Sequence, residues 1–474
     1  MENREDGIRA DRTARGVSFH GPSRLTQAKG RKGTGRVGRE MGVGSLGHVV
    51  VVGNGPVGSA SARALVERGA SRVTVVDGTP VGVASSHSDR ARLVRAADAE
   101  GDPAWSGRAM RSVGRFRELE ASSGVPFFRE CGALVLGPRA FSERALEAAR
   151  RSLQMSPGAG VKGSVVQALE EAEVRRRWGY LRPDDGCGHG VWQALGAGCV
   201  DPQAMVRAHV AQGRRLAAER DVGFHVVEGE AVNLEVSADG GVRVGLRAGG
   251  AVEGDRVVVA GGAGSNSLVA RSGLALDGVG GEETGVRVSR RAVVLAEVSE
   301  EVAHGVLGEM PTIKYAYDLG IGGGSGPARD GEQSRVEAGS VYILPPVLYP
   351  ELGNRWFVKA GGGAQDFVEG DTAAVAEAVK QWMDPSSELS PFQGQAVGSI
   401  EATLRQLLGG VDLLGNVQVK RCMTTISKSG AMDVWRVRGS GGRAVVFGAC
   451  QAKAAGPAYA IGEEVADALL DACP

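Results

Sequence analysis

Short apolar runs that end in glycine-rich turns dominate the hydrophobic pattern of this chain. The first run, 48–52, stops at the loop Gly53-Asn54-Gly55-Pro56-Val57-Gly58, and a helical pattern follows over 59–68. A second apolar run, 73–76, ends in Asp77. Apolar runs of this length, bounded by turn residues, predict buried strands, so their order predicts a parallel β-α-β unit.

The loop has the spacing G-x-G-x-x-G, in which each glycine has a physical task. The first glycine permits a tight turn, the second lets the backbone approach a pyrophosphate, and the third lets helix and strand pack closely. The helix N-terminus offers unpaired N–H groups to phosphate, and an acid after the second strand binds a ribose diol. A chance glycine turn is the alternative, but the order of strand, loop, helix, strand and acid favours nucleotide binding. The predicted nucleotide-binding residues are Gly53, Gly55, Pro56, Val57, Gly58 and Asp77.

The rest of the pattern predicts an α/β fold with two interleaved domains. We expect helices at 105–122, 142–153, 164–178, 203–220 and 458–470, a turn at 196–200, and a polar glycine-rich loop at 320–331. We expect strands at 127–136, 223–227, 231–236, 242–248, 256–260, 288–299, 340–346, 355–361 and 443–447. The glycine turn after 256–260, which contains Gly262, suits the close approach of a ligand, although an ordinary strand-end turn has the same composition.

Composition narrows the class of protein. The chain has 474 residues, with 55 Lys and Arg against 55 Asp and Glu, which argues against a nucleic-acid or membrane-surface partner. No apolar run approaches the ~20 residues of a membrane span. The six cysteines form no C-x-x-C pair, which favours a reduced intracellular compartment, cytoplasmic or organellar, peroxisome and plastid included.

The N-terminal segment 1–47 differs from the rest of the chain. It is rich in Arg, Lys and Gly and lacks apolar periodicity, so we expect a disordered tail, with Met41 as an alternative start. It has no apolar secretory core, and its acidic residues are unfavourable for a transit peptide. The C-terminal residues 472–474 are not a peroxisomal S-K-L signal.

Four further segments carry recognisable motifs. They are Ser86-His87 with Arg92-Leu93-Val94-Arg95, the strand Trp356-Phe357-Val358-Lys359-Ala360-Gly361, the segment Cys422-Met423-Thr424, and Val445-Val446-Phe447-Gly448 with Gly456-Pro457. Over 48–474 they resemble the D-amino-acid-oxidase-type superfamily of FAD-dependent oxidoreductases, above all monomeric sarcosine oxidase, N-methyltryptophan oxidase and pipecolate oxidase. The resemblance implies a Rossmann-type FAD-binding domain interleaved with a mainly antiparallel substrate domain.

The resemblance also implies roles for single side chains. By this resemblance, Arg92 lies over the flavin and Arg95 binds a substrate carboxylate. A guanidinium binds a carboxylate with two parallel hydrogen bonds. Lys359 faces the flavin and activates O2, because a buried ammonium stabilises developing negative charge. The plainer alternatives are a solvated basic loop at 85–95 and a strand-end lysine whose ammonium stays in water.

The same resemblance implies a covalent bond between Cys422 and the flavin. Lys420 and Arg421 are its neighbours in sequence, and nearby cations favour the thiolate that such a bond requires. A free buried cysteine is the alternative. The remaining FAD contacts are expected at Ser86, His87, Val232, Gly262 and Gly456.

The chain departs from the family pattern around the substrate. The family's final loop ends in a lysine that shares the substrate carboxylate, and Lys453 in the loop 449–455 is near the corresponding place, with its register uncertain by a few residues. Thr424 stands where the family has tyrosine, and Gly362-Gly363 stand where it has Tyr-His. We therefore expect a retained flavin site, an altered substrate pocket and no metal.

These expectations combine into one functional hypothesis. It is an FAD-dependent oxidase of a secondary amine or N-methyl amino acid, monomeric, with hydride transfer to flavin N5, imine hydrolysis, and reoxidation by O2 to hydrogen peroxide. The alternatives are a dehydrogenase of a 2-hydroxy or amino acid with another electron acceptor, and a flavin-fold protein with a degenerate, non-catalytic pocket. A nicotinamide-dependent reductase is a weaker alternative, because Cys422 has no role in such an enzyme. The expected FAD-binding segments are 48–129, 191–275 and 421–474, and the expected substrate-domain segments are 130–190 and 276–420.

Overall fold

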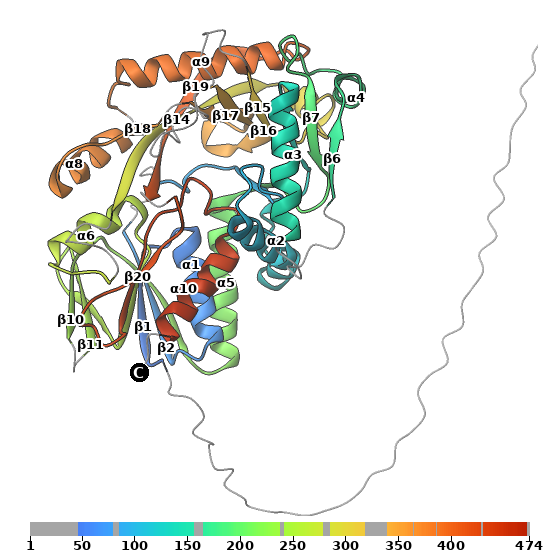
Figure 1. The fold of residues 1–474 in the computed structure, drawn as a ribbon. Helices are drawn as coiled ribbons and strands as arrows, with labels where there is room; N and C mark the ends of the chain where they lie inside the picture. The colour runs from blue at the N-terminus through green and yellow to red at the C-terminus, as the bar shows by residue number, and fades with distance from the viewer. Residues whose placement is uncertain are drawn as a thin grey trace, which may run out of the picture. The chain divides into compact units, whose positions relative to one another are not determined.

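A six-stranded sheet carries the predicted nucleotide fingerprint (Figure 1). Its order is β20 (Val434–Arg436), β21 (Ala444–Phe447), β13 (Arg256–Val259), β1 (His48–Val52), β2 (Arg72–Asp77) and β9 (Gly223–Glu228). All neighbours pair in parallel except β20 with β21. The predicted parallel β-α-β unit is confirmed, and strands from the middle and the C-terminal part of the chain complete its sheet.

The computed structural model describes residues 46–78, 85–155, 165–237, 241–277, 285–317, 339–363, 365–384, 386–427 and 430–471. The chain divides into units 1–44 and 45–474, and all of these residues belong to the second. The expectations for 1–45, for Met41, for the loop 320–331 and for 472–474 lie outside the described residues.

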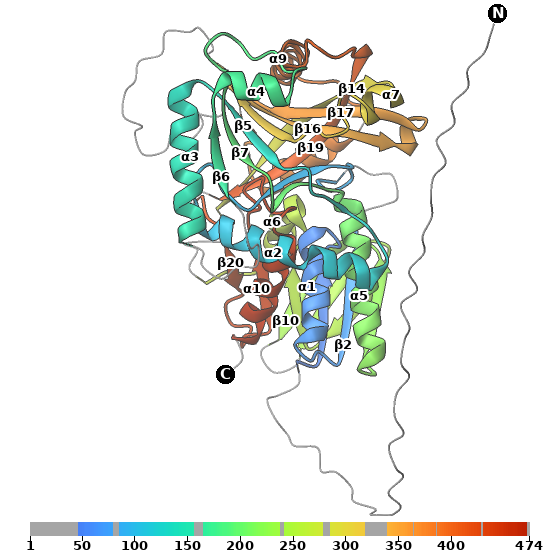
Figure 2. The ribbon, with the colours of Figure 1, turned by 90° about the vertical axis from the view of Figure 1, so that its right-hand side faces the viewer.

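Both faces of the six-stranded sheet are buried, which explains its continuous apolar strands. The helices α1 (Pro56–Glu67), α5 (Pro202–Glu219) and α10 (Ala458–Leu470) lie side by side on one face (Figures 1 and 2). The other face packs against a three-stranded sheet of β10 (Ala231–Ser237), β11 (Gly241–Leu246) and β12 (Ala251–Gly254). None of the described helices is long and apolar enough to cross a membrane.

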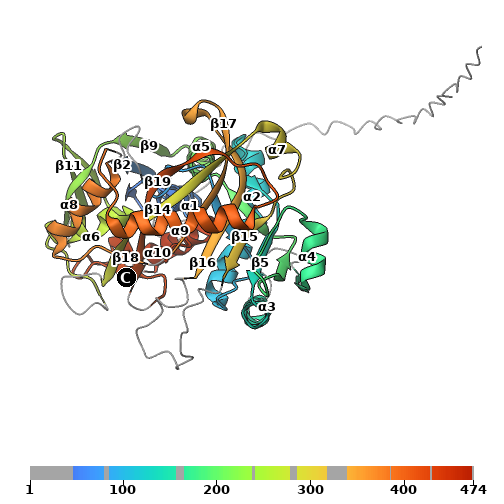
Figure 3. The same cartoon turned by 90° about the horizontal axis from the view of Figure 1, so that it is seen from above.

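A second, mainly antiparallel sheet of nine strands forms the other large layer. Its strands are β5 (Ala133–Gly137), β6 (Val166–Leu169), β7 (His189–Gln193), β14 (Val286–Val298), β15 (Thr312–Ala316), β16 (Ser340–Tyr349), β17 (Arg355–Gly362), β18 (Asp366–Phe367) and β19 (Leu414–Ser427). Helix α9 (Pro391–Leu407) crosses one face of this sheet, over the largest apolar cluster (Figure 3).

A small sheet of β3 (Arg92–Arg95), β8 (Ala197–Val200) and β4 (Phe128–Arg129) completes the strands. The remaining helices are α2 (Pro103–Ser123), α3 (Arg139–Gln154), α4 (Glu171–Arg177), α6 (Ser265–Arg271), α7 (Glu300–His304) and α8 (Thr372–Met383).

Three local predictions were wrong. The expected strand 127–136 is two strands in different sheets, because the chain turns at Gly132, whose φ is 76°. The expected helix 164–178 begins with the strand β6, and only its later part is helical, as α4. The expected turn at 196–200 is the buried strand β8, in which Gly198 serves a close backbone approach rather than a turn. A Cβ at Gly198 would lie 2.1 Å from the carbonyl oxygen of Arg129.

Candidate active site

The fingerprint loop has the backbone geometry that its glycines predict. Gly53 has φ 102°, and a Cβ there would lie 2.5 Å from the carbonyl oxygen of Ala260. A Cβ at Gly58 would lie 1.9 Å from the carbonyl oxygen of Gly53. Helix α1 begins after Gly55 with no side chain capping its first turn, so its N–H groups remain available to an anion.

We expect Gly58→Ala to abolish formation of the flavin-bound protein, because the new methyl group collides with backbone that has no room to move. Flavin absorbance of the purified protein and its Tm are the measurements. Gly394→Ala in α9 is the matched control, because the site of its Cβ is open space. The control should keep full flavin content and gain at most about 1 kcal/mol of stability. A Gly58→Ala protein with normal flavin content would contradict the assignment of this loop.

The acid after β2 is held by the fingerprint loop itself. Asn54 donates a hydrogen bond from Nδ2 to Oδ2 of Asp77 at 3.1 Å. The Oδ1 atom of Asn54 is buried and has no partner among the described residues. A ligand hydroxyl would satisfy that acceptor, which fits the predicted ribose position. Gly262 lies in the turn after β13, beside β1, and Val232 lies in β10, where its carbonyl accepts from Arg271.

The loop after β2 joins the fingerprint to β19. The hydroxyl of Ser86 donates to the carbonyl of Met423 at 2.7 Å, which places this loop beside Cys422. His87 lies close enough to Gly55 that a Cβ there would be 3.6 Å from its Nδ1. Burial lowers the pKa of His87, so its ring is neutral at pH 7. A Cβ at Gly456 would lie 2.9 Å from Cβ of Val94, so the final loop packs against β3.

Lys359 is fully buried in β17, and its ammonium is held by two oxygen atoms. It donates to the carbonyl of Ala91 at 2.7 Å and pairs with the carboxylate of Asp89. Asp89 also accepts from the hydroxyl of Tyr349 at 2.7 Å and from Arg92 at 3.0 Å. Lys359 therefore faces the protein interior beside Arg92, and the alternative of a strand-end ammonium in water is wrong.

The pKa values of this buried group follow from burial and charge. Burial, with the charge of Arg92, lowers the pKa of Lys359 to about 8. Burial alone would raise the pKa of Asp89, but Lys359 and Arg92 outweigh it and hold that pKa well below its ordinary range. Asp89 is thus a carboxylate at neutral pH, and it fixes the position of both cations.

The cation beside Cys422 comes from a different strand than the sequence suggested. Lys420 pairs with Glu351 at 3.2 Å, and Arg421 donates to the backbone carbonyls of Asp384 and Ser387. Arg92 lies against the cysteine instead, with its Nη2 at 3.8 Å from Sγ of Cys422. The expected electropositive surroundings of the thiol are present, supplied by the arginine predicted to lie over the flavin.

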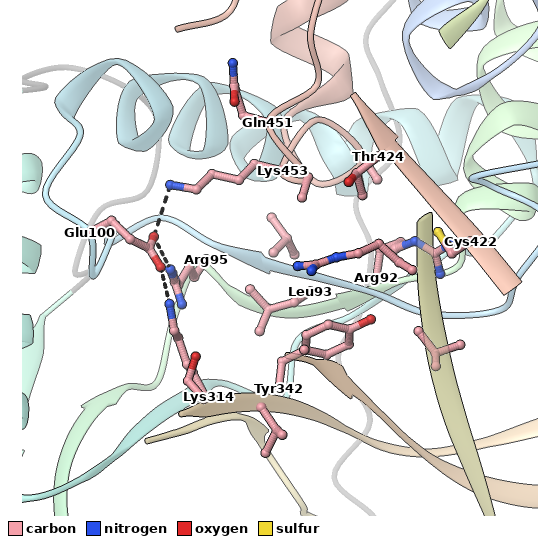
Figure 4. Close-up of a pocket in the computed structure, with 18 of the residues that line it drawn as sticks. Arg92, Leu93, Arg95, Glu100, Lys314, Tyr342, Cys422, Thr424, Gln451 and Lys453 are labelled. Carbon is pink, nitrogen blue, oxygen red and sulfur yellow. Dashed lines mark hydrogen bonds and ion pairs between the residues drawn. The ribbon is translucent and has the colours of Figure 1, made fainter. Parts of the chain in front are cut away.

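One cavity of about 250 Å³ is lined by four of the predicted residues, Arg92, Arg95, Cys422 and Lys453 (Figure 4). At one end Glu100 is held by Arg95 at 2.6 Å, by Lys453 at 3.1 Å, and by Lys314. Asp98 lies behind them, at 3.4 Å from the ammonium of Lys453. Arg92 and Cys422 line the other end of the same cavity. Lys453 and Arg95 therefore lie on the same carboxylate, although the sequence left the register of the final loop uncertain.

Several groups in this site were not predicted. Lys314 on β15, Glu100 in the β3–α2 connection and Tyr342 on β16 line the cavity. Burial raises the pKa of Tyr342, so its phenol is neutral. The role of Asp89 was also not predicted, although an acidic residue within the basic segment 85–95 was a usable signal. The sequence around Lys314 contains no comparable signal. Thr424 and Gly363, which stand where the family pattern has larger side chains, line the cavity.

Comparisons with known proteins show which fold and family this chain shares. A 130-residue stretch is 27% identical to N-methyl-L-tryptophan oxidase of Yersinia pestis (strain Pestoides F), and it spans 27% of this chain and 33% of that relative. NikD, an unusual amino acid oxidase essential for nikkomycin biosynthesis, has a similar fold, with TM-score 0.61 and 18% identity over 89% of this chain and 93% of that chain. Iminodiacetate oxidase from Chelativorans sp. BNC1 matches with TM-score 0.61 and 16% identity over 90% and 96%. The family model described as FAD dependent oxidoreductase matches residues 48–454, and the chain belongs to this family.

Proposed function

We propose that this protein is an FAD-dependent oxidase of a secondary amine or N-methyl amino acid that carries a carboxylate. The observation that carries the proposal is a single cavity with two chemically different ends. Arg95, Lys453 and Lys314 gather at one end, and Arg92 and Cys422 line the other, beside the buried Lys359. A small zwitterion or anion can therefore bind its carboxylate at the Arg95 end, with its reacting carbon toward the Arg92 and Cys422 end, where we expect the flavin.

The residues divide the work between binding and electron transfer. Arg95 and Lys453 bind the substrate carboxylate, which competes with Glu100 for the same donors. Bound FAD supplies the electron acceptor for the C–H bond next to the amine nitrogen. The ammonium of Lys359, fixed by Asp89 and Ala91, stabilises negative charge that develops on O2. The resulting imine hydrolyses in water.

Oxygen uptake with a panel of N-alkyl amino acids tests the proposal. We expect uptake with at least one secondary amine that carries a carboxylate, and one hydrogen peroxide formed for each O2 consumed. Substrate-dependent reduction of a dye without O2 uptake would favour the dehydrogenase alternative. A flavin-containing protein that neither consumes O2 nor reduces a dye with any member of the panel would overturn the enzymatic proposal.

Replacement of Cys422 by serine should release the flavin from its covalent bond. In the unmodified protein we expect yellow colour to stay in the pellet after acid precipitation, because the proposed bond survives unfolding. In Cys422→Ser the colour should move to the supernatant. Cys450→Ser is the control, a half-buried cysteine whose sulfur contacts the carbonyl of Thr425. Colour retained in the pellet by Cys422→Ser would show that the flavin is bound covalently through another residue.

Oxygen reactivity should fall as pH rises through about 8. The pKa of Lys359 is lowered to about 8 by burial, so the ammonium is present below that pH and is lost above it. The rate of O2 consumption at saturating substrate should follow the charged form. Electron transfer to a dye should not share this pH dependence, and an identical fall with both acceptors would contradict the assignment to Lys359.

A further inference from the structure

Two cysteines lie together behind the strand that carries Arg92. In the small sheet Cys199 of β8 pairs with Arg129 of β4, and with Leu93 of β3 on its other side. A Cβ at Gly198 would lie 2.9 Å from the backbone N of Cys131, so the chain after β4 runs very close to β8. This close approach brings Cys131 against the buried apolar cluster that contains Cys199, so the two cysteines pack together.

The surroundings make the two thiols chemically unequal. Cys199 is only 5% exposed, whereas Cys131 is half-buried. The neighbouring Cys199 thiol, with the charge of Arg129, lowers the pKa of the Cys131 thiol. The neighbouring Cys131 sulfur and burial raise the pKa of Cys199 well above its ordinary value. Cys131 is therefore the nucleophile of the pair, and Cys199 keeps its proton.

A second cavity, separate from the Arg95 cavity, lies near the segment that carries Cys131. It has a volume of about 660 Å³, and Arg129, Tyr180 and His304 are among its lining residues. The hydroxyl of Tyr180 is buried and has no partner among the described residues. Arg129, which lines this cavity, precedes Cys131 by two residues, so the cavity lies close to this part of the chain. A small polar oxidant thus has both space and hydrogen-bonding groups near the more reactive thiol.

We propose that Cys131 and Cys199 are an oxidisable dithiol that hydrogen peroxide closes into a disulfide. The Cys131 thiolate attacks one peroxide oxygen, so an S–O bond forms, the O–O bond breaks, and the released hydroxide takes up a proton as water. The sulfur of Cys199 then attacks that of Cys131, so the S–S bond forms and the S–O bond breaks. The departing hydroxide takes the Cys199 proton as a second water. Two thiols are oxidised, and one peroxide is reduced to two waters.

The position of the pair gives the bond a consequence. Cys199 packs with Ala91, whose carbonyl holds Lys359, and its neighbour Val200 pairs with Arg92. A disulfide would join β8 to the chain after β4 and so fix the sheet that carries Arg92 and Arg95. If the proposed function is correct, the peroxide that this enzyme releases forms near Lys359, and the cysteine pair lies close to that lysine through Ala91.

The test uses the reduced, flavin-containing protein and added hydrogen peroxide, so it does not depend on the proposed oxidase activity. Peptide mapping by mass spectrometry should find a Cys131–Cys199 crosslink with two hydrogens lost, while Cys187 and Cys450 remain thiols. In Cys199→Ser, a sulfenic-acid probe should label Cys131 and no crosslink should form. In Cys131→Ser, neither product should form. Flavin absorbance of each variant confirms that it is folded.

Two results would overturn the proposal. One is oxidation of Cys131 to sulfinic acid in the unmodified protein without any crosslink, which would show that Cys199 does not reach it. The other is a Cys131 thiol that reacts with peroxide no faster than Cys450 does, which would show that its surroundings do not activate it.

Discussion

Replacing Lys359 with methionine is expected to slow reaction with O2 by about a hundredfold to a thousandfold, the range seen when one preorganised donor to a developing anion is removed. Lys359 is fully buried, and its ammonium has fixed oxygen partners in Asp89 and Ala91. Methionine has a similar shape and no charge, so it removes the electrostatic stabilisation and leaves the packing nearly intact. Electron transfer from substrate to FAD should be retained, because Arg95 and Lys453, which donate to the substrate carboxylate, lie at the far end of the cavity.

A matched set of variants separates charge from stability. Lys359→Met leaves the Asp89 carboxylate buried with Arg92 and Tyr349 as partners, and loss of one buried ion partner costs about 3–5 kcal/mol. The double variant Lys359→Met with Asp89→Asn also removes the carboxylate that pairs with Arg92, so we expect its Tm to be no higher than that of the single variant. It should remain as slow with O2 as the single variant. Lys380→Met, an exposed lysine of α8, should change neither quantity.

The acceptor alternatives predict different results for the same set. If O2 is the natural acceptor, Lys359→Met loses O2 consumption and keeps dye reduction. If another acceptor serves the enzyme, the unmodified protein already reacts slowly with O2, and the substitution changes little. Recovery of O2 consumption by the double variant would contradict a direct role of the Lys359 ammonium.

Replacing Arg95 with methionine is expected to raise KM for a carboxylate substrate by about tenfold to a hundredfold, because a hydrogen bond between charged groups contributes about 1.5–3 kcal/mol. The guanidinium of Arg95 lies 2.6 Å from Oε2 of Glu100 and 3.5 Å from Oδ1 of Asp98. These contacts show that its donors already face carboxylate oxygens within the cavity. Initial rates over a range of substrate concentrations measure the effect.

Substrate analogues make this prediction specific to the carboxylate. An analogue that lacks the carboxylate makes no charged hydrogen bond with Arg95, so its KM should be nearly the same with either protein. Arg139→Met is the control, because Arg139 pairs with Glu170 on an exposed surface. An equal loss with both kinds of substrate would show that Arg95 acts through the fold of the β3–α2 connection and not through the carboxylate.

Local sequence predicted the nucleotide fingerprint well because its physics is local. A strand, a glycine turn and a helix are adjacent in the chain, and the tasks of Gly53 and Gly58 require only their own backbone. The error at 196–200 has the opposite origin. Two glycines indicated a turn, but Gly198 is needed because another strand, 60 to 70 positions earlier in the chain, passes against it. Proximity of that kind leaves no mark on local composition.

The candidate site shows the same division between local and distant contacts. Motifs marked Arg92, Arg95, Lys359 and Cys422, and the structure places them around one cavity or directly behind it. The cation at Cys422 could not be predicted from its sequence neighbours. Arg421 points to the opposite face of β19, and Lys420, on the same face as Cys422, pairs with Glu351. Lys314 joins the Arg95 cluster through the pairing of β15 with β16, which nothing in its own surroundings in sequence predicts.

The central claim is that one cavity binds a carboxylate-bearing amine next to a flavin that passes electrons to O2. Anaerobic titration of the purified protein with N-alkyl amino acids, followed by admission of air, tests it most directly. The account predicts that one such compound bleaches the visible flavin absorbance, and that air restores the absorbance with formation of hydrogen peroxide. A visible flavin spectrum that no amine or amino acid bleaches would contradict the account.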